Sequence, residues 1–98
     1  MTQKIPESTV TEVESLLIRR AAEYGWTCVR TEVQDDSEFL LVHVEVGSDS
    51  VVERMNGRIY AYDVLDARVP PKDDGTYSWT VVFFSGGEVL DSVMHEVV

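Results

Sequence analysis

The side chains best suited to catalysis or metal binding are scarce in this chain of 98 residues. His43 and His95 are the only histidines, and Cys28 is the only thiol. No two of these three residues lie at metal-ligand spacing along the chain, and there is no paired-cysteine motif. We therefore expect no bound metal and no cofactor.

Cys28 and His43 form the one pair that could support nucleophilic catalysis, because they fall on strands expected to be neighbours. Cys28, however, has neither a glycine-rich elbow nor a helix start after it, and these features usually activate a thiol. A free cysteine in a strand is more often a small buried apolar residue. We therefore expect no catalytic residues and a protein that is not an enzyme.

Acidic residues dominate the charge. Eighteen Asp and Glu face eight Lys and Arg, for a formal net charge of −10. Such a chain repels phosphate backbones and anionic membranes, so we expect no direct contact with nucleic acid or membrane. A basic partner protein would be attracted instead. The acids expected to bind it lie in predicted turns: Asp35, Asp36, Glu38, Asp49, Asp73, Asp74 and Glu88.

Four aromatic residues form a second candidate contact surface. Tyr60 and Tyr62 share one face of a predicted strand, and Tyr77 and Trp79 share one face of another. Pairing of the two strands would bring the four rings together. Because Tyr and Trp dominate interface hot spots, we expect this row to contact a partner wherever the helix leaves it uncovered.

A strand over residues 38–46 should be the centre of the fold. From residue 40 its even positions are aliphatic, and its odd positions become polar towards the end, which is the period of a strand with one buried face. The buried row is continuous, so the strand should lie inside a sheet. Its members are Leu40, Val42, Val44 and Val46.

The N-terminal part predicts a loose arm over residues 1–8 and then a helix of about 15 residues. Thr9 and Glu12 have the spacing of a capping box, and Gly25 is a natural stop. The apolar side chains recur every three or four residues on one stripe, which should face the sheet. They are Val10, Val13, Leu17, Ala21 and Tyr24.

The remaining strands are predicted over residues 26–34, 58–69 and 77–84. The first should pair with residues 38–46 as an antiparallel hairpin. Residues 51–55 fit either one helical turn or a strand, and Asn56-Gly57 favours the strand because this dipeptide is a strong hairpin signal. Pro70-Pro71 should end the long extended segment that follows.

The C-terminal residues 89–97 fit two structures. Their apolar side chains follow a helical stripe, whereas Gly86-Gly87 and the many valines favour a hairpin and a strand. The pattern slightly favours the helix. The whole is expected to be a single α+β domain over residues 1–98, with an N-terminal helix packed on an antiparallel sheet of four to five strands.

Taken together, these features predict a non-enzymatic, acidic, cytoplasmic protein that occludes the basic, nucleic-acid-binding surface of a partner. Small inhibitors encoded by phages and mobile elements, such as anti-CRISPR proteins and DNA mimics, share this composition. Acidic immunity proteins and antitoxins that block nucleases are one alternative. The other is a small enzyme or ligand-binding domain with a pocket between helix and sheet, lined by His43, Cys28, Tyr60 or Tyr62.

Overall fold

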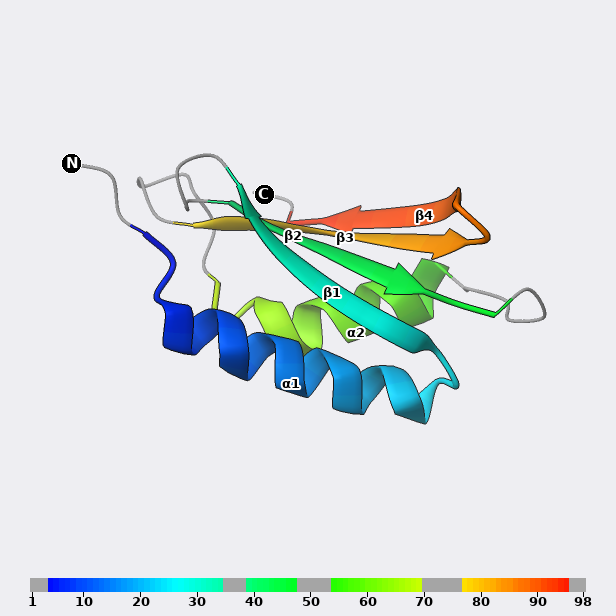
Figure 1. Ribbon diagram of the computed structural model, residues 1–98, viewed down its shortest axis with the longest axis horizontal. Helices are drawn as coiled ribbons and strands as arrows, with labels where there is room; N and C mark the ends of the chain where they lie inside the picture. The colour runs from blue at the N-terminus through cyan, green and yellow to red at the C-terminus, as the bar shows by residue number, and fades with distance from the viewer. Residues whose placement is uncertain (1–3, 35–38, 48–53, 70–76, 96–98) are drawn as a thin grey trace.

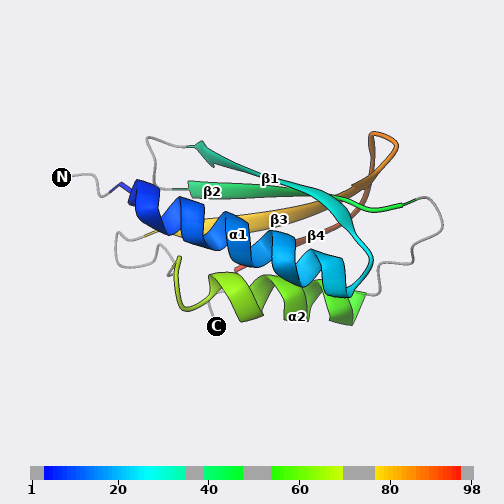
Figure 2. The ribbon, with the colours of Figure 1, turned by 60° about the horizontal axis from the view of Figure 1, so that its bottom comes forward.

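The computed structural model describes residues 4–34, 39–47, 54–69 and 77–95. It is an α+β fold in which both helices cover the same face of one four-stranded sheet (Figures 1 and 2). The predicted fold class is therefore confirmed. The elements in chain order are α1 (Glu7–Glu23), β1 (Thr27–Gln34), β2 (Phe39–Glu45), α2 (Arg54–Leu65), β3 (Ser78–Ser85) and β4 (Glu88–Met94).

Helix α1 begins two residues before the predicted start. The carbonyl oxygen of Pro6 accepts hydrogen bonds from the N–H groups of Thr9 and Val10, at 3.0 and 3.1 Å. Thr9 therefore lies inside the first turn, no side chain caps the helix, and the predicted capping box is wrong. Ile5 is buried in the core, so the part of the predicted arm that the structure describes is packed rather than loose.

The hairpin of β1 and β2 is antiparallel, as predicted, and β2 lies inside the sheet. The predicted buried row of β2 is confirmed, because Leu40, Val42 and Val44 are fully buried against the helical layer. Glu14 on α1 accepts hydrogen bonds from the backbone N–H and the hydroxyl of Thr31. These bonds tie α1 to β1.

Helix α2 replaces two predicted elements, the Asn56-Gly57 hairpin and the extended segment over residues 58–69. The reason is visible in burial. The residues at helical spacing are all buried, which a strand period of two could not achieve. They are Gly57, Tyr60, Ala61, Val64 and Leu65. The local turn signal was thus overridden by packing of this face on the sheet and on α1.

The bounds of β3 differ by one residue from the predicted strand over residues 77–84. That it lies beside β2 was not predicted. It pairs with β2 in parallel, so the sheet is mixed and the expectation of a fully antiparallel sheet is wrong. Parallel neighbours need a crossover connection, usually a helix, and α2 provides it. Trp79, Val81 and Phe83 share one face, which is buried against the helices.

The C-terminal segment is a strand, so the slight preference for a helix was wrong. Strand β4 pairs antiparallel with β3 through the turn at Gly86 and Gly87, whose φ angles are 59° and 84°. It forms an edge of the sheet, and Val93 is its only fully buried side chain. An edge strand with so few buried side chains shows no clear alternation of apolar and polar residues in its sequence.

The four aromatic residues do not form one row on paired strands, as was predicted. Tyr60 and Trp79 are buried, so they belong to the core and present no surface to a partner. Tyr60 and Tyr62 lie on α2 and not on a strand beside Tyr77. Tyr62 still meets Trp79, edge to face at 5.0 Å, but across the helix–sheet interface. Neither described helix is long and apolar enough to span a membrane.

Candidate protein-binding surface

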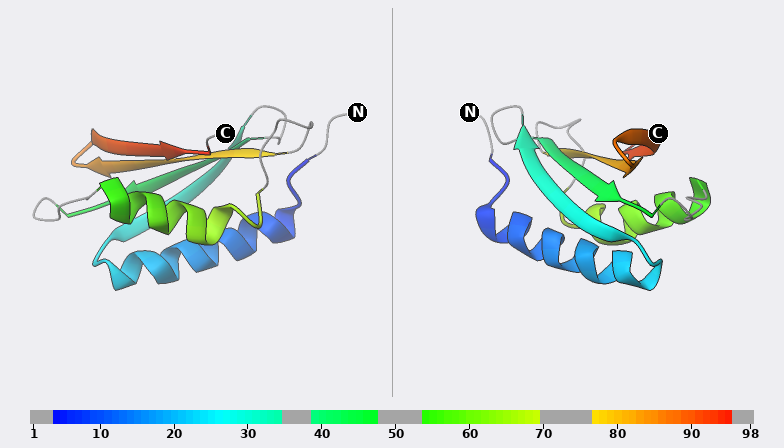
Figure 3. Two further views of the ribbon diagram at one scale, coloured as in Figure 1. Left: turned by 180° about the vertical axis from the view of Figure 1, so that it is seen from behind. Right: turned by 45° about the vertical axis from the view of Figure 1, so that its right-hand side comes forward.

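The sheet has a second face that no described helix or strand covers (Figure 3). Side chains alternate along each strand, so the residues between the buried positions of β2 and β3 point away from the helices. We call this surface the open face. Its central apolar side chains are Phe39 and Leu41 on β2 and Val82 and Phe84 on β3, all partly exposed.

The apolar part of the open face runs diagonally across the two central strands. In the register of β2 and β3, Phe39 lies beside Ser78 at one end and Glu45 lies beside Phe84 at the other. On β4, the 57% exposed Val89 pairs with Phe84 and extends the surface to the edge. We call the diagonal of Phe39, Leu41, Val82 and Phe84 the apolar lane. Glu32 and Arg30 on β1 are among the polar residues beside it.

One end of the open face is hollowed. The hollow has a volume of about 370 Å³ and is lined by Arg30, His43, Glu45, Phe84 and Gly87. The His43 ring stacks on Phe84 with centroids 5.3 Å apart. Glu45 accepts a hydrogen bond from the Gly86 N–H at 3.1 Å, which anchors the β3–β4 turn beside it. The walls are therefore held by contacts within the protein.

The chemistry of this hollow is limited. Nε2 of His43 lies 3.8 Å from a carboxylate oxygen of Glu32 and is itself buried without a hydrogen-bond partner. Among the described residues, no hydroxyl or thiol is hydrogen-bonded to this nitrogen and could act as a nucleophile. The side chain of Cys28 lies outside the described part of the chain, so the Cys28–His43 pair is untested.

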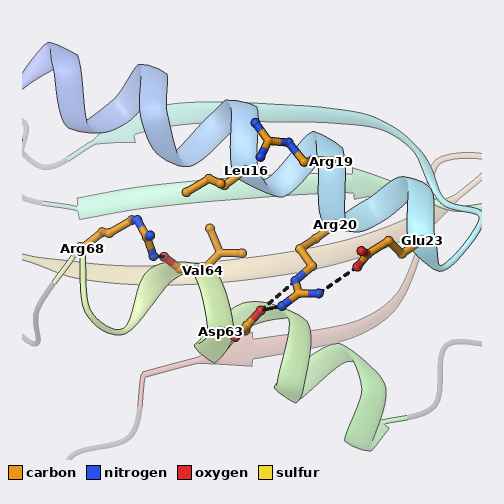
Figure 4. A pocket seen from close by; sticks show the side chains of 7 residues that line it. All are labelled: Leu16, Arg19, Arg20, Glu23, Asp63, Val64 and Arg68. Carbon is orange, nitrogen blue, oxygen red and sulfur yellow. Dashed lines mark hydrogen bonds and ion pairs between the residues drawn. The ribbon is translucent and has the colours of Figure 1, made fainter.

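A second groove, of about 350 Å³, lies between the outer sides of α1 and α2 (Figure 4). Arg20 sits at its centre and bonds both Glu23, at 2.9 Å, and Asp63, with its Nε at 2.7 Å. These hydrogen bonds, first that of Glu23 and then that of Asp63, raise the pKa of Arg20. Arg68 similarly reaches Glu12, at 3.3 Å. The arginines here link the two helices.

Charge is unevenly divided between the layers. The helical segments, residues 4–23 and 54–69, contain six acidic and six basic residues, whereas the four strands contain four acidic residues and one basic. The strand acids are Glu32, Glu45, Glu88 and Asp91. Glu88 is the only predicted partner-binding acid that the structure describes, and it is exposed. The others lie outside the described residues: Asp35, Asp36, Glu38, Asp49, Asp73 and Asp74.

The described chain brings no three His, Cys, Asp or Glu side chains together as a metal site. Sequence reasoning also missed the apolar open face. The signal was present, because Phe39, Leu41, Val82 and Phe84 occupy the strand positions that should be polar if that face met only water. Tyr77 and Tyr62 are both half-buried against the core. Each therefore has only part of its ring available to a partner.

The fold and its surface define an α+β domain with two helices on one face of a mixed sheet and an apolar second face. No known protein-family model, curated protein or solved structure matches the chain. Its function is therefore argued from the surface itself.

Proposed function

We propose that this protein is a non-enzymatic acidic binding protein that occludes a basic, nucleic-acid-binding surface of a partner protein. The observation that supports this most is the uneven charge. The helical layer has equal numbers of acidic and basic residues, so the excess negative charge belongs to the strands and to the segments outside the described residues. A solubilising surface would not require such a division.

The ends of the strands add to this argument. Gln34 pairs with Phe39, Phe39 with Ser78, and Thr80 with Met94, so these four strand ends lie side by side at one end of the sheet. The sequences attached there contain six acidic residues and one lysine. Five of the acids expected to bind a partner are among them: Asp35, Asp36, Glu38, Asp73 and Asp74.

The open face supplies the apolar contact that charge alone does not provide. Protein interfaces combine an apolar centre with a polar rim, and an exposed apolar patch on a soluble domain often marks such a site. Phe39, Leu41, Val82 and Phe84 would form the centre. Acidic residues would steer a basic partner towards it and raise the association rate.

The mechanism fits an anti-defence inhibitor and a nuclease-blocking immunity protein or antitoxin equally well, because both act by covering a basic site. Two of the residues named for the pocket alternative lie on opposite sides of the sheet. His43 points to the open face, whereas Tyr60 is buried on the helical side of the sheet, so these two residues cannot line a common cavity.

Displacement by duplex DNA tests the proposal. The protein is used to capture its partner from source cells, and the purified pair is titrated with duplex DNA of random sequence. We expect the partner to be a nucleic-acid-binding protein. We also expect DNA to displace this protein from the partner, at DNA concentrations set by the affinity of the partner for DNA. A complex that takes up DNA without releasing this protein would contradict occlusion.

A further inference from the structure

Each of the two central strands has two apolar side chains on the open face in addition to its buried apolar row. In β2 the run Phe39-Leu40-Leu41-Val42 is continuous, and β3 contains Val81-Val82-Phe83-Phe84. Continuous apolar runs are typical of parallel strands that are covered on both sides, usually by helices. Strands β2 and β3 are such a parallel pair, yet the described helices cover only one side. The apolar lane of Phe39, Leu41, Val82 and Phe84 therefore resembles in composition the side that α1 and α2 cover.

We propose that the open face receives one amphipathic helix of the partner protein, with an apolar stripe and basic flanks. This inference rests on the proposed function and specifies the kind of element that the partner presents. The apolar lane spans the seven residues of β2 from Phe39 to the level of Glu45, whose six steps cover about 20 Å. A helix of about 13 residues has the same length.

Charge complementarity selects a basic helix. Around the lane, Glu32 lies beside Leu41 on the β1 side, and Glu45 lies beside Phe84. Arg30 is the only basic residue on the described strands. A helix with Lys or Arg on both sides of its apolar stripe would meet carboxylates, whereas an acidic helix would be repelled.

A strand added at the β4 edge is less suitable. The Ser92 N–H donates to the Asp91 carboxylate at 2.9 Å, and the Met94 carbonyl accepts from the Tyr62 hydroxyl at 3.4 Å. Edge groups of β4 are thus occupied by side chains of the protein, which is a common way to prevent strand addition. A second copy is also disfavoured, because it would bring its own Glu32 and Glu45 to the same lane.

Three synthetic peptides of 14 residues test this inference on the intact protein. The first has leucine and lysine at helical spacing, the second has the same composition in strict alternation, and the third has glutamate in place of lysine. Binding is measured by fluorescence anisotropy, peptide helicity by circular dichroism, and the site by amide chemical shifts. We expect the first peptide to bind about tenfold or more tightly than the second, to become helical, and to shift residues of β2 and β3.

Variants locate the site. Leu41→Asn and Met94→Asn should each weaken the first peptide at least about fivefold, since Met94 pairs with Thr80 on the open face. Ile18→Asn is the matched control, because Ile18 on α1 is 51% exposed and Met94 is 56% exposed. The control should bind as the wild type does. Folding of Leu41→Asn is checked by thermal melting, and Met94→Asn provides the same test at an exposed position.

The outcomes separate this inference from the proposed function. Equal, salt-sensitive binding of the two lysine peptides would overturn the helix but leave the acidic binding surface. Shifts confined to β4 and its edge would overturn it in favour of an added strand. A dimer in sedimentation that Leu41→Asn dissociates would show that a second copy occupies the face. Binding of the glutamate peptide as tightly as the lysine peptide would contradict the role of charge itself.

Discussion

Tyr60 on α2 donates a hydrogen bond from its buried hydroxyl to the main-chain carbonyl oxygen of Leu17 on α1, across 3.2 Å. Both residues are fully buried, and they are 43 positions apart in the chain. This bond joins the two helices beneath the sheet and adds to the ion pairs that Arg20 and Arg68 make between the helical segments.

Tyr60→Phe should lower the free energy of unfolding by about 1 kcal/mol, the usual contribution of a buried hydrogen bond. The ring packing is retained, so only the hydroxyl is tested. Tyr24→Phe is the control: the Tyr24 ring stacks on Trp26, and no hydrogen bond of its hydroxyl is found among the described residues. Urea unfolding of both variants measures the difference. Equal stability of the two would contradict the role of the Tyr60 bond.

The same tyrosine should make the protein sensitive to alkaline pH. Burial raises the pKa of Tyr60 above its ordinary value of 10.0, because the charged phenolate is poorly solvated there. The neutral form is therefore favoured in the folded state, and its contribution is complete below pH 10 and lost as the pH rises above it. Unfolding titrations from pH 8 to about pH 11 should show a steeper loss for the wild type than for Tyr60→Phe. Parallel curves would refute this assignment.

Gly86→Ala and Gly87→Ala should each cost about 1–2 kcal/mol of stability. Both glycines have positive φ, which is unfavourable for a residue with a β-carbon. Space is not the reason, since an added β-carbon would meet no atom within 4 Å at either position. Gly47→Ala is the control, because Gly47 is exposed and is not among the described glycines with positive φ. It should change stability by only a few tenths of a kcal/mol.

Removal of two strand carboxylates should weaken the natural partner more than removal of two helix carboxylates. Glu32→Gln with Glu88→Gln is expected to raise the dissociation constant about five- to tenfold. Glu7→Gln with Glu23→Gln removes the same charge from the balanced helical layer and should stay within about twofold. Titration calorimetry of both double variants measures this. Equal losses would mean that only total charge matters, and the open face would lose its assigned role.

The elements predicted best from the sequence are those with one clear buried apolar face, β2 and α1. The alternation around Leu40 and Val42 requires one buried face, and the stripe of Val13 and Leu17 requires a helix facing it. Helix α2 was missed because Asn56-Gly57 is a strong local signal, whereas the competing pattern of Tyr60, Ala61 and Val64 becomes decisive only when the sheet is there to bury it.

The pairing of the strands and the site were harder to predict. Parallel pairing of β2 with β3 follows from the crossover through α2, so one missed helix produced the wrong sheet. Strand β4 buries only Val93 and therefore has no readable period. For the site, acidic residues in predicted turns and aromatic residues were chosen as candidates because of their residue type alone. The apolar open face was overlooked because Phe39 and Leu41 were read as ordinary non-core positions of a strand.

Salt dependence of partner binding tests the central claim most directly. The dissociation constant of the natural complex is measured from low to high sodium chloride, with a neutral osmolyte series as the control. Because exposed charges are screened within about 10 Å at 0.1 M salt, the acidic-surface account predicts a steady, at least about hundredfold loss of affinity over a tenfold rise in salt. An affinity that stays constant over the same range would contradict it.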